Sequence, residues 1–163
     1  VDKASLYGVQ NPSLKKGILL VGEFGTGKTW MMKLFMKNQR QTFFMRHAKE
    51  IANQYQTEGG DQRLYIDKFK NAANDASVFF HPFSGLCIDD IGTENVKKNY
   101  GNDKNVIGDI MELRYKDGNC GPFLHATTNF SVDELEEKYG ARLRSRMREM
   151  FNYIVLSGED RRK

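Results

Sequence analysis

Residues 22–29 read Gly22-Glu23-Phe24-Gly25-Thr26-Gly27-Lys28-Thr29. The stretch fits the pattern G-x-x-x-x-G-K-[ST]. A continuous apolar run at residues 17–21 precedes it and predicts a buried strand. Residues 28 to about 39 follow it, with apolar side chains at helical spacing. The pattern therefore predicts a glycine-rich loop that joins a buried strand to a helix, which is a typical beginning of an α/β fold.

The chemistry of this loop favours a polyphosphate ligand. Glycines let backbone N–H groups turn inward around phosphate oxygens, and the N-terminus of the next helix adds partial positive charge. Lys28 is predicted to reach the β- and γ-phosphates, and the Thr29 hydroxyl is predicted to ligate Mg²⁺. All of residues 22–29 are therefore predicted to bind ATP or ADP. The alternative is a glycine-rich turn with an exposed lysine, and the strand and helix on either side argue against it.

Length and composition limit the class of protein. With 163 residues, 39% of them apolar and 28% charged, the chain fits one soluble globular domain over residues 1–163. It has no apolar run of the roughly 20 residues that span a bilayer, and no signal peptide. Reduced thiols are expected at Cys87 and Cys120, so we expect a cytoplasmic protein with no membrane contact. A net charge of +4 is compatible with nucleic acid, but a solvated basic surface explains it at least as well.

Short apolar runs alternate with longer periodic stretches, which predicts βα units around a parallel sheet. Further strands are predicted at residues 42–45, 86–88, 123–127 and 152–156. Further helices are predicted at residues 48–56, 62–76, 106–118, 131–140 and 141–148. Ser131 and Glu134 form a capping-box pattern at the start of one of them.

Two carboxylates, Asp89 and Asp90, come directly after the buried strand at residues 86–88. Ligands of open α/β sheets bind at the carboxyl ends of the strands. Asp89 is predicted to hold the hydration shell of Mg²⁺, and Asp90 to orient or deprotonate the attacking water. Glu94 is a weaker candidate for the second role. The alternative is a pair of aspartates that only begins a turn before Gly92.

The strand at residues 123–127 also ends in polar residues. If it lies beside the acidic strand, Asn129 points toward the γ-phosphate or the water, because an amide can both donate and accept there. Considered alone, Asn129 is better explained by a turn that leads into the Ser131 cap. His125 lies within the strand and is predicted to be a satisfied core histidine.

An arginine-rich helix is predicted at residues 141–148. Leu143 and Met147 share a face and should point to the core. Four arginines flank this stripe, at positions 142, 144, 146 and 148. A guanidinium that reaches the nucleotide of an adjacent subunit would act as an arginine finger. A solvated basic face is an equally good explanation.

Taken in order, these motifs resemble a known family. They are the glycine-rich loop, Cys87 to Gly92, Thr127-Thr128-Asn129, and the segment from Tyr139 to Arg148. Together they resemble the AAA+ ATPase domain of the DnaC/DnaI-type replicative helicase loaders, to which the IstB transposition helper ATPases are related. The resemblance covers residues from about 16 to about 162.

The resemblance implies a three-layer α/β P-loop NTPase of the AAA+ type, with a five-stranded parallel sheet and a reduced or absent helical lid. It implies that Asn129 is the sensor-1 residue, that Arg146 is the arginine finger and that Arg142 supports it. It also implies a homo-oligomer that grips single-stranded DNA. A hexameric helicase would bind through an N-terminal region outside this sequence. Asp90 stands where such proteins usually carry glutamate, which predicts slow, assembly-dependent hydrolysis.

Other interpretations remain open on the sequence. An IstB-like transposition helper would bind DNA without a helicase partner. A small-molecule P-loop kinase would need an arginine-bearing lid, and a regulatory ATP-binding module would show negligible turnover. Residues 97–100 combine lysines with a tyrosine that could stack on a base, although a solvated charge run is the commoner explanation. By family analogy, Leu6, Tyr7 and Gly8 line the adenine pocket.

Overall fold

The computed structural model describes residues 12–36, 43–57, 85–95, 97–99, 102–116 and 124–160. Its strands are β1 (Gly17–Gly22), β2 (Phe43–His47), β3 (Gly85–Asp89), β4 (Lys97–Asn99), β5 (Asn102–Lys104), β6 (Leu124–Thr128) and β7 (Phe151–Leu156). Its helices are α2 (Lys28–Phe35), α3 (Ala48–Thr57), α5 (Val106–Lys116), α6 (Val132–Tyr139) and α7 (Ala141–Met150). The helix predicted at residues 62–76, the adenine-pocket residues 6–8, and Cys120 lie outside the described residues.

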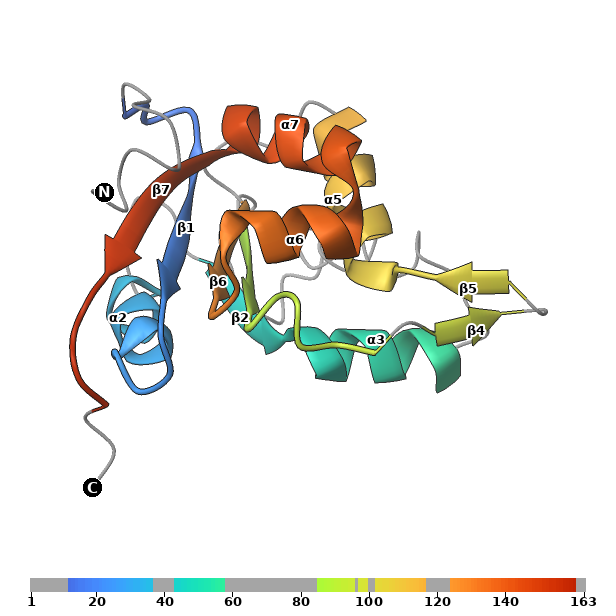
Figure 1. Cartoon of the computed structure of the whole chain (residues 1–163), viewed down its shortest axis with the longest axis horizontal. Coiled ribbons are helices and arrows are strands. Elements are labelled where there is room, and N and C mark those ends of the chain that lie inside the picture. The colour runs from blue at the N-terminus through green and yellow to red at the C-terminus, as the bar shows by residue number, and fades with distance from the viewer. Residues whose placement is uncertain are drawn as a thin grey trace, which may run out of the picture.

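The main sheet has five strands in the order β2-β3-β6-β1-β7, and each neighbouring pair is parallel. The predicted five-stranded parallel sheet is therefore confirmed. The strand that leads into the glycine-rich loop, β1, lies between β6 and β7. Since all five strands run the same way, the loops after β1, β3 and β6 leave the same edge of the sheet (Figure 1). That edge is where parallel sheets bind their ligands.

Helices cover both faces of this sheet, which gives the predicted three layers. On one face, Leu20 of β1 and Cys87 of β3 pack with Met32 of α2. On the other face, a larger core joins the sheet to α3, α5, α6 and α7. Alternation along β1 places Leu19 in this larger core and Leu20 on the opposite side.

The sequence missed one element and misplaced several ends. The missed element is an antiparallel pair of short strands, β4 and β5, which lies apart from the main sheet (Figure 1). The first helix, expected to run to about residue 39, is described only to Phe35. After β7, residues 157–160 form no helix within the described part of the chain. Every helix in the described ranges is too short or too polar to cross a bilayer.

The predicted cap of α6 is present. The Ser131 hydroxyl accepts a hydrogen bond from the Glu134 backbone N–H at 3.3 Å, and the Glu134 carboxylate accepts from the Ser131 N–H at 2.7 Å. These hydrogen bonds from Ser131 hold the pKa of the Glu134 carboxyl below its usual value. The cap fixes where α6 begins, directly after the polar end of β6.

Candidate nucleotide-binding site

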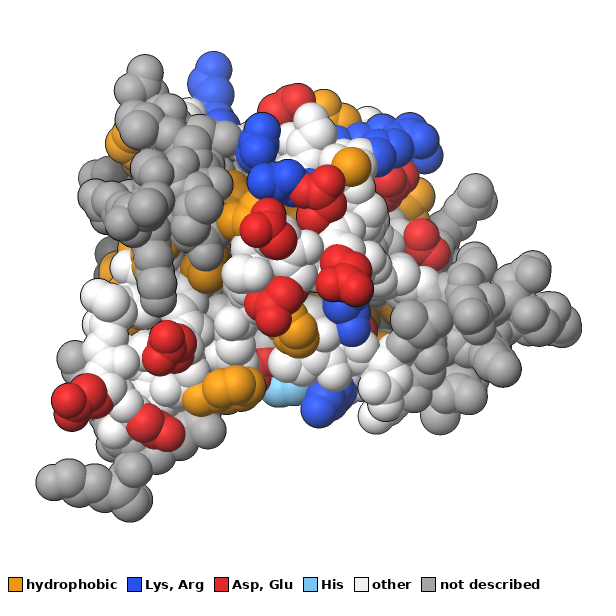
Figure 2. Space-filling view, viewed as in Figure 1, with side chains coloured by type: hydrophobic (Ala, Val, Ile, Leu, Met, Phe, Trp, Pro, Cys, Tyr) orange, Lys and Arg blue, Asp and Glu red, His pale blue; other side chains and the backbone are white. Residues whose placement is uncertain are grey.

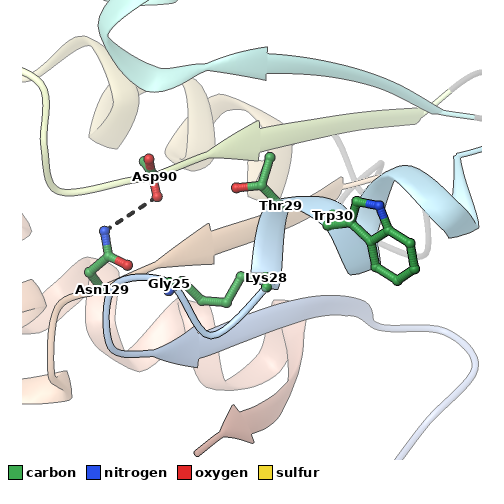
Figure 3. Close-up of a pocket in the computed structure, with 7 residues that line it drawn as sticks. Gly25, Lys28, Thr29, Trp30, Asp90 and Asn129 are labelled. Carbon is green, nitrogen blue, oxygen red and sulfur yellow. Dashed lines mark hydrogen bonds between the residues drawn. The ribbon is translucent and has the colours of Figure 1, made fainter. Parts of the chain in front are cut away.

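A cavity of about 370 Å³ opens at the edge of the sheet where β1, β3 and β6 end. Its lining comes from the glycine-rich loop, the start of α2 and the ends of two strands: Gly25, Gly27, Lys28, Thr29, Trp30, Asp90 and Asn129 (Figure 3). This volume lies within the range of small-molecule sites. The sequence placed all of these residues except Trp30 in the candidate site.

The loop adopts the left-handed backbone that its glycines permit. Gly25 has φ 77° and Gly27 has φ 89°, a region that residues with a β-carbon rarely enter. Gly27 caps α2 without a side-chain hydrogen bond, and the first turn of α2 contains no acidic residue. Backbone N–H groups at such a helix start are suited to bind an anion.

The Lys28 side chain is folded back onto this loop. Its ammonium donates to the carbonyl oxygens of Gly22 at 2.8 Å and Glu23 at 2.7 Å, and the residue is only 4% exposed. A buried ammonium requires such oxygen partners. To reach a phosphate as predicted, the ammonium would have to exchange these carbonyl oxygens for phosphate oxygens.

Thr29 and Asp89 meet at the start of α2. The Thr29 hydroxyl lies 3.0 Å and 3.1 Å from the two carboxylate oxygens of Asp89. Asp89 is buried and also accepts a hydrogen bond from the Thr127 hydroxyl at 2.6 Å. The sequence predicted the first two residues as the metal site but did not identify Thr127, which lies on the neighbouring strand β6.

Thr29 and Asp89 supply the small number of protein ligands that Mg²⁺ needs. Mg²⁺ keeps several waters and needs only one or two carboxylates, rather than an all-protein cage. Among the described residues, no group of three His, Cys, Asp or Glu side chains could hold a metal. Because the Thr29 hydroxyl and the Asp89 carboxylate lie 3.0 Å apart, they could hold Mg²⁺ together with phosphate oxygens and water, and a bound Mg²⁺ would neutralise phosphate charge.

Asp90 is placed as the sequence predicted, next to Asn129. The Asn129 amide donates to the Asp90 carboxylate at 3.4 Å, and both side chains line the cavity (Figure 3). Asp90 has φ 55°, a left-handed conformation that aspartate tolerates better than most residues. Its backbone N–H is held by the Thr127 hydroxyl at 2.9 Å. The left-handed turn directs the carboxylate into the cavity, while Asp89 stays with Thr29.

His47 is a contact of Asp90 that the sequence did not reveal. Its Nε2 lies 3.2 Å from the second Asp90 carboxylate oxygen. His47 ends β2 and is aligned with Asp89 of β3 in the sheet register. Only the pairing of β2 with β3 brings them together, so the sequence alone held no signal for this contact.

Two other expectations from the sequence have clear structural outcomes. Glu94 does not line the cavity: its buried carboxylate accepts from the Gly92 N–H at 2.9 Å and the Tyr139 hydroxyl at 2.7 Å. It therefore fixes the turn after β3 to α6.

His125 is buried, and its Nδ1 accepts from the Ile18 N–H at 3.1 Å, which confirms a satisfied core histidine.

The arginines of α7 lie away from the cavity. Leu143 and Met147 are buried, as expected, and basic side chains gather over α7 with acidic ones among them (Figure 2). The Arg146 side chain is 15% exposed, with one guanidinium nitrogen 3.0 Å from the Glu112 carboxylate of α5 and its charge over the Tyr115 ring. The Arg142 side chain is 72% exposed, and its Nε lies farther from the same Glu112 carboxylate, at 3.9 Å. Neither arginine reaches the site of its own protomer.

Comparison with known proteins identifies the class. Residues 18–153 match the ATPase family associated with various cellular activities (AAA). The chain belongs to this family, and it is an AAA ATPase domain. Nucleotide binding is the general property of that class.

Individual relatives agree with this assignment. The 26S proteasome regulatory subunit 6B homolog of Saccharomyces cerevisiae is 30% identical over 115 residues, which cover 68% of this chain. The chain spans only 25% of that protein's length. In fold, it is similar to the DnaC helicase loader, with a TM-score of 0.63, 20% identity and coverage of 95% of this chain and 86% of DnaC. It is also similar to DnaI, with a TM-score of 0.61, 20% identity and coverage of 98% and 80%.

Proposed function

We propose that this domain binds and hydrolyses ATP, and that it acts as a nucleotide switch in loading a replicative helicase onto single-stranded DNA. The observation that carries the catalytic part is the convergence of Thr29, Asp89, Asp90 and Asn129 at one edge of the sheet. The loading role is supported by the fold similarity to the DnaC helicase loader and by the motif order that resembles this family.

In the proposed site, residues 22–29 bind the phosphates. Backbone N–H groups of the loop and of the first turn of α2 surround the β-phosphate, and Lys28 pairs with the β- and γ-phosphates. Thr29 and Asp89 hold Mg²⁺. Asp90 and Asn129 position the water, and Asp90 accepts its proton as the oxygen attacks the γ-phosphorus and the bond to ADP breaks.

Within the described residues, no arginine of the same chain lines the cavity. Arg146 and Arg142 lie on α7 beside Glu112 of α5, and neither lines the cavity. In the proposed reaction, Arg146 of a neighbouring protomer stabilises the transition state, so hydrolysis depends on assembly. In that assembly, single-stranded DNA is the proposed ligand, and the helicase binds through a region outside this sequence.

Two alternatives remain as outcomes of a test. An IstB-like transposition helper would show the same assembly and DNA dependence without binding a helicase. A small-molecule kinase or a low-turnover regulatory module would show no dependence of specific activity on protein concentration.

The decisive experiment measures ATP hydrolysis against protein concentration, with and without single-stranded DNA. We expect specific activity to rise with both in the wild type. Arg146→Ala should remove the rise while ATP still binds, and Arg148→Ala, an exposed arginine on the same helix, should keep it. Activity that is independent of concentration and unchanged in Arg146→Ala would exclude the trans arginine. Hydrolysis at the wild-type rate in Lys28→Ala would exclude the proposed site itself.

A further inference from the structure

Large apolar side chains, here called the apolar patch, are exposed in the glycine-rich loop and on the helix that follows it. Phe24 is 63% exposed, Trp30 is 66% exposed and Leu34 is 59% exposed. Phe24 lies within the loop, and Trp30 and Leu34 are neighbours one turn apart on α2. Large apolar side chains that are this exposed are candidates for contact with a ligand or partner.

Of these three side chains, only Trp30 lines the candidate cavity. Asp90 and Asn129 lie at one end, the glycine-rich loop and Lys28 lie between, and the indole of Trp30 lies at the other end (Figure 3). Along its length, the site therefore changes from hydrogen-bonding groups, through the loop, to a flat apolar ring. A nucleoside triphosphate has the same order, from γ-phosphate through the phosphate chain to the base.

We infer that the indole of Trp30 is the platform on which the nucleobase stacks, with Leu34 extending the apolar surface beneath the base and ribose. This inference rests on the proposed function, since it requires the triphosphate to lie along residues 22–29. Stacking suits an exposed tryptophan because one face packs on the base and the other stays on the protein surface. Because Trp30 lies at the end of the cavity opposite Asp90 and Asn129, it contributes to binding and not to the chemical step (Figure 3).

The test compares a ligand that carries a base with one that does not. MgATP and magnesium tripolyphosphate are titrated calorimetrically into wild type, Trp30→Ala and Trp30→Phe. Leu14→Ala serves as the control, because Leu14 is exposed and lines neither described cavity. The substitution to alanine is compatible with α2, since alanine favours a helix.

We expect Trp30→Ala to weaken MgATP binding roughly fivefold to a hundredfold, the range of one base–aromatic stack, while tripolyphosphate binding stays within about twofold. Trp30→Phe should fall between, and Leu14→Ala should match wild type. Trp30 is the chain's single tryptophan, so its emission in the wild type should be quenched by MgATP and left unchanged by tripolyphosphate.

Four outcomes would overturn the inference. If Trp30→Ala weakens both ligands equally, Trp30 shapes the loop and does not bind the base. If it leaves MgATP binding intact but prevents assembly, the patch contacts another subunit. A third outcome is that wild type binds both ligands, Lys28→Ala binds neither, and Trp30→Ala binds both with unchanged affinity. The inference about Trp30 then fails, while the proposed phosphate site is supported. A wild type that binds neither ligand would overturn the proposed function and this inference together.

Discussion

Asp160 lies directly over Gly25: its α-carbon is 2.8 Å from the point that a β-carbon on Gly25 would occupy, and its carboxylate is closer still. The residues that follow β7 therefore cross the loop that is proposed to bind phosphates. A negative charge at this position repels an incoming phosphate. Any nucleotide bound along residues 22–29 must tolerate or displace this carboxylate.

The first prediction concerns this charge. Asp160→Asn should tighten MgATP binding by roughly fivefold, because removing one charge about 4 Å from another in a water-like medium is worth about 1 kcal/mol. Calorimetric titration at low salt measures the change. Glu159→Gln alters the net charge equally at the neighbouring position and should leave the affinity within about twofold. Equal tightening by both variants would mean that only the overall charge matters.

Much of the fold followed from the sequence because its signals are local. Apolar runs marked the strands of the main sheet, and the Ser131–Glu134 capping box marked the start of α6 to the residue. The β4–β5 pair was missed because its strands are short and polar, so they show no apolar alternation. For such a pair, only the backbone pairing reveals the strands.

The site residues that belong to recognisable motifs could be predicted from the sequence. The glycine-rich loop and the acidic strand end identified Thr29 and Asp89, which do meet. The contacts of His47 and Thr127 with the acidic pair were not predictable, because both residues reach it through sheet pairing. Thr127 belongs to the Thr127-Thr128-Asn129 motif, but the motif alone does not reveal its contact with Asp89. Trp30 was not considered in the sequence analysis, and its position in the cavity follows only from the structure, where the residue is 66% exposed.

The second prediction concerns His47. His47→Ala should lower the rate of ATP hydrolysis by about tenfold with little change in the Kd for MgATP, because the Asp90 carboxylate loses the imidazole that holds one of its oxygens. Single-turnover hydrolysis and calorimetry separate the two quantities. Arg46→Ala is the matched control, since Arg46 precedes His47 and pairs with Glu50 outside the cavity. A loss of ATP affinity without a change in rate would show that His47 acts on binding instead.

The third prediction concerns the buried network around Glu94. Tyr139→Phe removes the hydroxyl that donates to Glu94 at 2.7 Å and accepts from the Gly92 N–H at 2.8 Å. A buried carboxylate that loses a donor costs about 1–3 kcal/mol of unfolding free energy. Urea unfolding measures this loss. Tyr115→Phe removes an exposed hydroxyl contact to Glu149 and should cost no more than about 0.5 kcal/mol. Equal losses in the two variants would contradict the role assigned to Glu94.

The fourth prediction concerns alkaline pH. Burial, followed by the charge of Asp89, raises the pKa of the Cys87 thiol well above its usual value, and burial with the charge of Glu94 raises the pKa of the Tyr139 phenol. In the unfolded chain the thiol loses its proton near pH 8.5 and the phenol near pH 10, at the values typical of free side chains. The native state keeps both protons, so the unfolded state binds fewer protons and stability falls as pH rises.

The unfolding free energy should therefore be steady toward neutral pH and decrease above about pH 8.5, by up to about 1.4 kcal/mol per pH unit for each of the two groups. Urea unfolding of wild type and Cys87→Ala between about pH 7 and pH 10 tests this, with the phenol contributing only at the upper end. Cys87→Ala should start less stable because its methyl group fills less of the space beside Leu20 and Met32. Its stability should nevertheless fall less steeply than that of wild type between about pH 8.5 and pH 10, since the thiol no longer titrates. Parallel curves for the two proteins would show that Cys87 ionises as readily in the folded state as in the unfolded chain.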